Sequence, residues 1–414
     1  MIAGRRQLGH ELAAAFLAGP WEAEAMGARG RRMLGRRPGW LREVVEETLL
    51  AYHRPPLDRP RELAAYVAIV LEELPRPPRR ARVRRPALFE TRMLGSPWPV
   101  PRIDAPGDLA ERLELDAGQL AWLADVRGLE LTAPEKARNY RYLHVPRKSG
   151  PPRVIERPKL RLKEIQRWIL RELLVWIPAH PAAHGFVRGR SAITHARVHS
   201  GRRVVVRLDL EDFFAGVTAA RVYGIFRTAG YPEAVAHALT GLCTNVVPAE
   251  HSVAGHYRLA RRLATSHLPQ GAPTSPALAN LAAFRLDARL AGLARDLGAT
   301  YTRYADDLVL SCDHRLRLPV GWIERIARDE GFRVNARKTR VMSRAGRQTV
   351  TGIVVNERLN VPRPEYDRLK AILHRGGEDL DLAPLEGRVS GVESLNPARG
   401  AKLRARLDEL RSSA

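Results

Sequence analysis

Two adjacent acids, Asp306 and Asp307, lie between two runs of strand-forming residues, 299–303 and 308–311. This pattern predicts a tight hairpin that places both carboxylates at the edge of a sheet. A third acid, Asp209, ends another apolar, strand-like run. Three carboxylates could hold two magnesium ions, which would activate an attacking hydroxyl and stabilise a leaving pyrophosphate. The pattern therefore predicts a nucleotidyl transferase, with a solvated turn as the alternative for an isolated pair of acids.

The chain is strongly basic, with 414 residues and a formal net charge of +24. A field of this sign attracts nucleic acid or an anionic membrane, and it does not determine the fold. No apolar run approaches the roughly 20 residues that cross a bilayer, so we expect no membrane partner. The two cysteines, Cys243 and Cys312, fit a reducing compartment and exclude a Cys-rich zinc module. We therefore expect a cytoplasmic protein with more than one domain or subdomain.

The first 130 residues predict a basic helical extension. Apolar residues at helical spacing predict helices in four segments: 7–17, 41–52, 63–74 and 108–123. The arginines of 29–37 predict a basic, glycine-containing connection, and the Pro- and Arg-rich run 75–86 predicts an exposed basic linker. This linker fits a solvated tether and a direct contact with nucleic acid equally well.

From residue 140 the pattern changes to a basic hairpin. Two short strands, 142–146 and 153–155, flank the run Lys-Ser-Gly-Pro at 148–151. Residues 131–170 contain eleven Lys or Arg and three Glu, a net charge of 11 − 3 = +8. Such a hairpin suits an incoming triphosphate and a template backbone, although a solvated turn would show the same composition. Helices are expected over 165–174 and 277–290.

Three blocks, in order, resemble those of bacterial retron-type reverse transcriptases. They are Leu208–Phe214 (LDLEDFF), Leu268–Pro276 (LPQGAPTSP) and Tyr304–Asp307 (YADD). They resemble, respectively, the first catalytic motif, the template-and-nucleotide loop and the metal-binding box of that family. A Val-Thr-Gly run at 350–352 also resembles retron enzymes, and His195–His199 resembles their Asn-Ala-x-x-His pattern with His195 in place of Asn. The resemblance covers residues from about 142 to 356.

The resemblance implies an α+β, right-hand polymerase with fingers, palm and thumb behind a helical N-terminal extension. Its implied domains are 1–130 for the extension, 131–360 for fingers and palm, and 361–414 for a helical thumb. The implied activity is RNA-directed DNA polymerisation from deoxynucleotides, with two Mg²⁺ ions or Mn²⁺ in their place.

The resemblance also implies site residues. Catalysis and metal binding fall to Asp209, Asp306 and Asp307, with the backbone carbonyl of Leu210 as a further metal ligand. The implied nucleotide-binding residues are Lys148, Arg153, Phe214, Gln270 and Gly271. The implied RNA- and template-binding residues are Arg188, Arg190, His199, Val350, Thr351 and Gly352.

Several of these residues keep a second interpretation. Phe214 would be a steric gate against the 2′-hydroxyl, or ordinary core. Lys338, in a block that resembles Asn-x-x-Lys-Thr, would protonate pyrophosphate or form a structural ion pair. His199 could satisfy a helix instead of contacting RNA. Gly352, between β-branched residues, predicts a bulge or a close backbone approach.

The retron resemblance implies a specific biology. The partners would be a structured noncoding RNA of the msr–msd type from the same locus, the DNA product and an effector protein. Priming from an internal guanosine 2′-hydroxyl would give branched RNA–DNA (msDNA), and the setting would be anti-phage defence. The alternatives are a reverse transcriptase of group II intron, diversity-generating or abortive-infection type, a catalytically inactive RNA-binding relative, and a basic architectural nucleic-acid binder.

Overall fold

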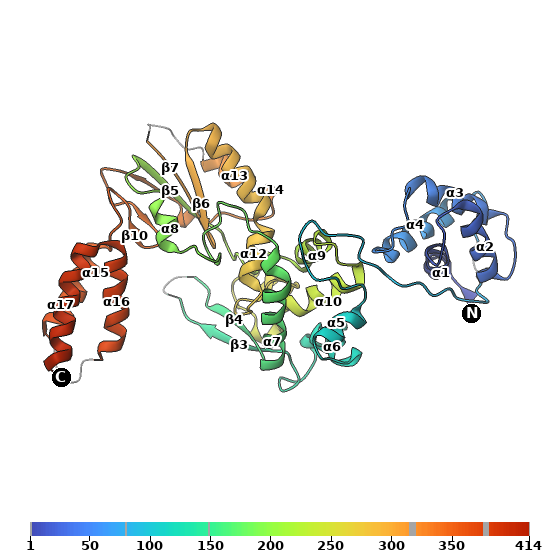
Figure 1. Ribbon diagram of the computed structural model, residues 1–414, viewed down its shortest axis with the longest axis horizontal. Coiled ribbons are helices and arrows are strands. Elements are labelled where there is room, and N and C mark those ends of the chain that lie inside the picture. The colour runs from blue at the N-terminus through green and yellow to red at the C-terminus, as the bar shows by residue number, and fades with distance from the viewer. Residues whose placement is uncertain (1, 79–80, 148–149, 314–319, 376–380, 414) are drawn as a thin grey trace. The chain divides into compact units, whose positions relative to one another are not determined.

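The computed structural model describes residues 2–78, 81–147, 150–313, 320–375 and 381–413 (Figure 1). Helices and strands are mixed along the chain, which confirms the α+β class. Two compact units alternate in sequence. Unit 1 comprises Met1–Ile177 and Thr218–Thr274, and unit 2 comprises Pro178–Val217 and Ser275–Ala414. Within the described ranges, no helix combines the length and the apolar character that crossing a bilayer requires.

Four helices at the N-terminus share one apolar core. They are α1 (Arg5–Leu17), α2 (Ala23–Leu34), α3 (Trp40–Ala51) and α4 (Pro60–Glu73). Three of them confirm the prediction, but α2 does not, because Arg29 lies within a helix and not in a connection. Its guanidinium donates to the carbonyls of Ala15 (2.7 Å) and Phe16 (2.8 Å), which the end of α1 leaves without helical partners.

The predicted exposed linker is wrong for residues 81–83. Strand β1 (Ile2–Ala3) pairs antiparallel with β2 (Ala81–Arg82), and the side chains of Ala81 and Val83 are buried in the helical core. The run packs against the helical core because its alternate apolar residues are buried, even though it is rich in arginine. Residues 79 and 80 lie outside the described ranges.

The predicted helix 108–123 is two helices, α5 (Pro106–Arg112) and α6 (Ala117–Leu123). Glu114 has a left-handed backbone (φ +53°), which ends the first helix. The carboxylate of Asp116 then accepts from the Gln119 amide (2.8 Å) and starts the second.

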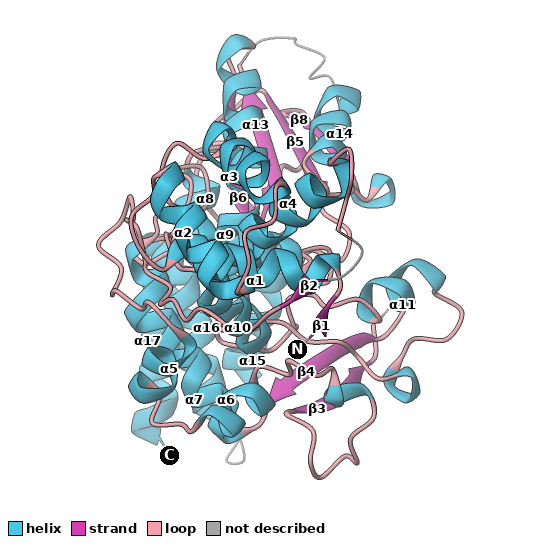
Figure 2. Cartoon of the chain, turned by 90° about the vertical axis from the view of Figure 1, so that its right-hand side faces the viewer, coloured by secondary structure: helices cyan, strands magenta, loops and turns pink. Residues whose placement is uncertain are grey.

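The rest of unit 1 contains a two-stranded ribbon and further helices. Strands β3 (Tyr140–Val145) and β4 (Arg153–Pro158) pair antiparallel, as predicted (Figure 2). The predicted helix 165–174 begins earlier, as α7 (Leu160–Trp168), and continues as a π-helical turn, Ile169–Leu173. The remaining helices are α9 (Ala219–Thr228), α10 (Glu233–Cys243) and α11 (Tyr257–Leu263).

Unit 2 is built on a four-stranded antiparallel sheet. Its strands are β5 (Val204–Asp209), β6 (Thr300–Tyr304), β7 (Asp307–Cys312) and β8 (Arg340–Ser343), in the order β6-β7-β5-β8. Strands β6 and β7 form the predicted tight hairpin, since Tyr304 pairs with Asp307 and only two residues lie between them. The two inner strands, β5 and β7, pair so that Asp209 lies opposite Asp307.

Helices and a small hairpin surround this sheet. They are α8 (Ala192–Arg197), α12 (Ser275–Ala282), α13 (Phe284–Asp296), α14 (Val320–Asp329), β9 (Thr349–Val350) and β10 (Ile353–Val354). The predicted helix 277–290 is therefore interrupted at Ala283, between α12 and α13. Helix α8 and the β9–β10 hairpin cover Val205 and Val309 of the sheet.

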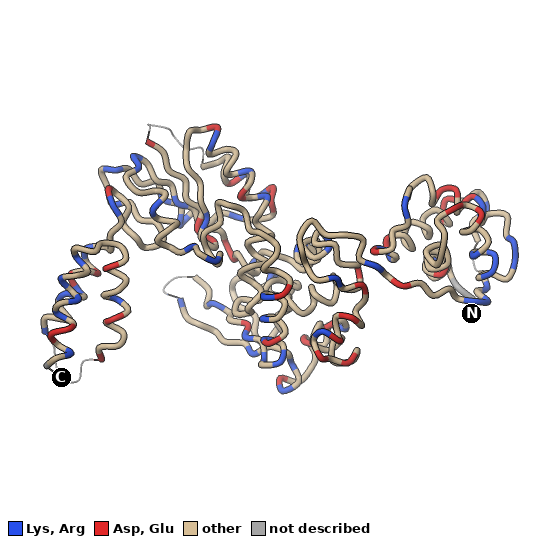
Figure 3. The backbone as a smooth tube through the Cα atoms, viewed as in Figure 1, with Lys and Arg blue, Asp and Glu red and all other residues tan. Residues whose placement is uncertain are grey.

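The described residues of 361–414, where helical structure was expected, form three helices: α15 (Arg363–Arg375), α16 (Leu382–Leu395) and α17 (Pro397–Ser413). They share a core that includes Leu369, Val389 and Leu407. Figure 3 shows both signs of charge along these helices. Arg404 of α17 forms an ion pair with Glu393 of α16 (2.6 Å), so part of the positive charge of these helices is neutralised by a neighbouring helix.

Candidate active site

The three predicted acids meet at one end of the sheet of unit 2. Asp209 ends β5, Asp307 begins β7 opposite it, and Asp306 lies in the turn before β7. The Leu210 amide donates to the Asp306 carbonyl (2.8 Å), and the Asn335 amide donates to the Asp209 carbonyl (2.7 Å). The first bond ties the end of β5 to the turn that carries Asp306, and the second ties it to the segment that precedes Lys338.

Their charges oppose one another. The pKa of Asp307 is raised to about 6, first by burial and then by the nearby Asp306 and Asp209 carboxylates, while Arg207 and Lys338 act in the opposite direction. Like charges that are held together in this way favour a counter-ion. Carboxylate oxygens are also the ligands that divalent cations such as Mg²⁺ prefer. The donor set and its repulsion thus fit a divalent cation.

The cation that the structure places on Asp209 is Lys338. Its Nζ donates to both carboxylate oxygens, at 2.9 Å and 2.8 Å. Within the described ranges, no three His, Cys, Asp or Glu residues are arranged to hold a metal ion. A metal ion on Asp209 would therefore replace the Lys338 ammonium. The geometry agrees with the ion-pair interpretation of Lys338, whereas proton donation to pyrophosphate stays a prediction.

Phe214 follows the acid of β5 and is half-buried in an aromatic cluster. Its ring centroid lies 6.2 Å from that of Phe186 and 5.6 Å from that of Phe213. Phe213 is buried and stacks on Phe332, so Phe213 belongs to the core. Phe186, whose contact with Phe214 was not predicted, has a left-handed backbone (φ +61°) and a half-exposed side chain.

Gln270 and Gly271 of the predicted nucleotide loop lie in unit 1, next to β4. The Glu156 amide donates to the Gln270 carbonyl (2.9 Å). Gly271 has φ +137°, and a Cβ there would lie 2.9 Å from the Glu156 carbonyl oxygen, so the position requires glycine. Arg153, the first residue of β4, is exposed. Lys148 lies outside the described residues.

A buried carboxylate under this loop was not predicted. Glu156 accepts from Asn245 Nδ2 (2.8 Å) and lies 2.9 Å from His267 Nε2. Burial lowers the pKa of His267, but the charge and hydrogen bond of Glu156 more than offset this and raise it. The available signal was strand alternation, because Val154, Glu156 and Pro158 share the buried phase of β4.

The predicted template-binding arginines differ in their surroundings. Arg188 is exposed. Arg190 donates through Nη1 to the carbonyl of Ala183 (2.7 Å) and also to that of Pro181, within its own loop. Arg188 is thus available to a ligand, whereas Arg190 already organises the loop.

His199 is not available for the predicted RNA contact, because its side chain is fully buried. Its Nδ1 lies 2.7 Å from Ser311 Oγ, and its Nε2 lies 2.7 Å from Thr302 Oγ1. The same Thr302 hydroxyl lies 2.8 Å from His195 Nδ1. The structure supports a structural role for His199, but its partners lie on strands β6 and β7 and not on a helix, as the second interpretation had expected.

These buried histidines predict a loss of stability in acid. Burial lowers the pKa of His195 and His199 to about 3, from 6.5. Between these values only the unfolded chain takes up the protons, so stability is complete above pH 6.5 and falls as the pH decreases. Each histidine should lower the free energy of unfolding by about 1 kcal/mol at about pH 5.5.

Urea denaturation at about pH 7.5 and about pH 5.5 checks this, with His195→Asn as the comparison. Over this pH interval, the free energy of unfolding of the variant should fall by about 1 kcal/mol less than that of the wild type. The reason is that its unfolded chain takes up one proton fewer. Equal losses in the two proteins would show that His195 does not contribute to the pH dependence.

The Val-Thr-Gly run forms a hairpin turn, and neither the predicted bulge nor the close backbone approach, since a Cβ at Gly352 would meet nothing within 4 Å. Thr351 (φ +46°) and Gly352 (φ +80°) connect β9 to β10, and Val350 pairs with Ile353. Positive φ at both positions is typical of a two-residue type I′ turn. The Val350 side chain is fully buried, which excludes it from a direct RNA contact. For the tip, Thr351 and Gly352, RNA contact stays a prediction.

Comparison with known proteins places these residues within a matched segment. Residues 145–365 match the family described as reverse transcriptase (RNA-dependent DNA polymerase). The chain is 45% identical over 281 residues to the retron Mx65 reverse transcriptase of Myxococcus xanthus, covering 66% of this chain and 65% of that protein. It is 38% identical over 336 residues to the retron Mx162 enzyme of the same organism, covering 75% and 68%.

A more distant relative is the retron Ec86 reverse transcriptase of Escherichia coli. It is 32% identical over 267 residues, which cover 62% of this chain and 78% of that protein. The chain thus spans about two thirds of the length of its Myxococcus relatives. Asp209, Asp306, Asp307 and Lys338 all lie within the family match.

Proposed function

Because the chain belongs to the reverse transcriptase family, and within it to the bacterial retron type, we propose that it copies RNA into DNA from deoxynucleotides. The observation that carries this proposal is the register of the sheet, which sets Asp209 opposite Asp307 beside the Asp306 turn. A binding protein without catalysis would have no need for three acids that oppose one another at one sheet end.

The family generally uses divalent metal ions, and we propose Mg²⁺. Asp209, Asp306 and Asp307 would hold the metal, with the Leu210 carbonyl as a further ligand. Bound Mg²⁺ would activate the primer hydroxyl and stabilise the departing pyrophosphate. Lys338, once released from Asp209, would give a proton to the pyrophosphate. Phe214 would lie beneath the sugar and exclude a 2′-hydroxyl by its bulk.

The parts of a right-hand polymerase can be assigned on this basis. The β3–β4 ribbon would serve as fingers, the four-stranded sheet as palm, and α15–α17 as thumb, behind an N-terminal extension of residues 1–130. Arg153 and the Gln270–Gly271 loop would contact the incoming nucleotide. Arg188 and the Thr351–Gly352 tip would contact the template or RNA.

The retron relatives suggest a more specific role. The template would be a structured noncoding RNA of the msr–msd type, primed from an internal guanosine 2′-hydroxyl to give branched RNA–DNA. An effector protein and a role in anti-phage defence would complete the system, in a cytoplasmic setting. The similarity to the Mx65, Mx162 and Ec86 enzymes supports this more specific role.

The test uses cells that carry the gene with its native flanking DNA. Nucleic acid treated with RNase should show a short, discrete DNA on a denaturing gel. This band should shift after treatment with a 2′–5′ debranching enzyme, and it should be absent from cells with the Asp306→Ala, Asp307→Ala variant. Synthesis on a supplied primer and template without any such band would keep the polymerase and exclude the retron product.

Lys338→Met should separate the two proposed roles of this lysine. Loss of the competing ammonium should tighten Mn²⁺ binding to the free protein about two- to fivefold. Loss of the proposed acid should slow nucleotide incorporation about a hundredfold. Lys338→Arg keeps the positive charge and should leave Mn²⁺ affinity near that of the wild type. Unchanged affinity in the Met variant would show that the ion pair does not compete with the cation.

A further inference from the structure

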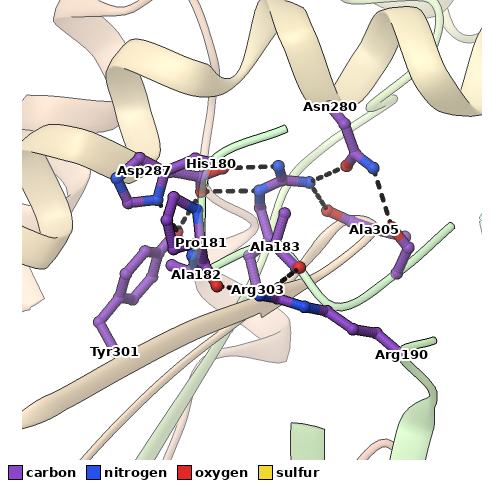
Figure 4. Close-up of polar contacts among 11 residues, drawn as sticks. His180, Pro181, Ala182, Ala183, Arg190, Asn280, Asp287, Tyr301, Arg303 and Ala305 are labelled. Atoms are coloured by element: carbon purple, nitrogen blue, oxygen red, sulfur yellow. Dashed lines mark hydrogen bonds and ion pairs between the residues drawn. The ribbon is translucent and has the colours of Figure 1, made fainter. Parts of the chain in front are cut away.

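Arg303, on β6, is fully buried beneath the turn that carries Asp306 and Asp307. Its Nε and Nη2 donate to the two carboxylate oxygens of Asp287 on α13, at 2.8 Å and 2.7 Å (Figure 4). Its Nη1 donates to Asn280 Oδ1 and to the Ala305 carbonyl, both at 3.0 Å. The guanidinium thus joins two helices to the backbone of the turn.

The turn residue that Arg303 holds has an unfavourable backbone conformation. Ala305 has φ +55°, a left-handed region that non-glycine residues rarely adopt and that its surroundings must maintain. Gly185 approaches the turn closely, since a Cβ there would lie 2.5 Å from the Ala305 nitrogen. Asn280 links the two supports, because its Nδ2 donates to the Gly185 carbonyl (2.9 Å) while its Oδ1 accepts from Arg303.

This support acts directly on the catalytic acids. The Ala305 carbonyl belongs to the peptide bond between Ala305 and Asp306. The orientation of this peptide bond therefore determines the positions of the Asp306 and Asp307 backbones, from which the two carboxylates extend. A buried ion pair contributes little to net stability, because desolvation offsets the attraction between its charges. The contribution of Arg303 is therefore one of specificity: by donating Nη1 to the Ala305 carbonyl, its guanidinium favours one conformation of the turn.

We propose that Arg303 is a positioning residue for the cation site, which holds the Ala305 carbonyl and thereby sets the affinity of Asp306 and Asp307 for the divalent cation. The inference rests on the proposed function, in which these acids hold that cation. A purely structural role, joining α13 to β6 through Asp287, is the alternative that an experiment must separate.

The separating variant replaces both partners, Arg303→Met with Asp287→Leu. Because it leaves no single buried charge, the protein should still fold. Its melting temperature should be moderately lower than that of the wild type, because the buried Tyr301 hydroxyl loses its acceptor, Asp287 Oδ1 (2.8 Å). The Ala305 carbonyl nevertheless loses its donor. The dissociation constant for Mn²⁺, measured on the full chain from the electron paramagnetic resonance signal of free Mn²⁺, should rise about tenfold or more.

A kinetic readout accompanies this binding measurement. The rate of single-nucleotide incorporation should fall in the double variant at limiting Mn²⁺ and recover as Mn²⁺ is raised, since the metal ligands themselves remain. A matched control removes another ion pair, Arg227 with Asp58 in unit 1 (2.7 Å). The variant Arg227→Met with Asp58→Leu should leave the Mn²⁺ affinity unchanged.

A second variant covers the case in which the double variant does not fold. Asn280→Ala keeps the ion pair and removes only the link between Arg303 and Gly185. It should raise the Mn²⁺ dissociation constant about threefold.

Folded variants that bind Mn²⁺ with wild-type affinity would overturn the inference and leave Arg303 a structural role. That result differs from failure of the proposed function, in which the wild type itself neither binds Mn²⁺ nor incorporates deoxynucleotides.

Discussion

Replacing Asp306 with Ala is expected to lower DNA synthesis by about a thousandfold or more. The substitution removes one of three carboxylates proposed to hold the cation, while the half-buried turn residue makes little contribution to the core. The fold should therefore survive. Because Asp306 is, after burial, the largest cause of the raised pKa of Asp307, that pKa should also fall in the variant. Incorporation of a single labelled deoxynucleotide on a primed RNA template measures the loss.

The control for this variant is Asp296→Ala, which removes an exposed acid at the end of α13. It changes the net charge by the same amount and should leave synthesis unaltered. If Asp306→Ala retained synthesis within a few-fold of the wild type, the proposed metal ligands would be wrong. If both variants lost it equally, the effect would belong to charge or folding and not to the site.

Replacing Phe214 with Val should relax sugar selection, with a fall of about a hundredfold in the preference for deoxynucleotides over ribonucleotides. The physical reason is exclusion by bulk, since the two substrates differ only in the 2′-hydroxyl. Use of deoxynucleotides should change much less than use of ribonucleotides. Ratios of kcat/KM for a matched pair, such as dGTP and GTP, give the measurement.

A second aromatic substitution controls for general damage. Phe284→Val, on α13, removes a half-exposed ring that contacts His180 and not the aromatic cluster of Phe214. It should leave the selectivity ratio unchanged. A Phe214→Val protein that selects deoxynucleotides as strongly as the wild type would return Phe214 to the alternative of ordinary core.

Local patterns predicted the elements that carry the acids. Strand-forming residues in 299–303 and 308–311, on both sides of two adjacent acids, predicted the β6–β7 hairpin, because a short connection between two strands leaves little freedom. Helical spacing predicted α1, α3 and α4. The same reasoning missed α2, because Gly27, Gly30 and several arginines resemble a loop, whereas packing allows the glycines to approach their neighbours and Arg29 to cap α1.

The sequence by itself therefore determined the class of chemistry: residue type and order are enough to recognise three acids at strand ends in a basic chain. Tertiary structure alone decided which side chains surround the three acids and which predicted site residues are buried. It buried His199, placed Lys338 on Asp209, and joined Arg303 to Asp287 across 16 positions. The reason is physical, since burial and charge pairing depend on which segments meet in space, and separation along the chain does not determine that.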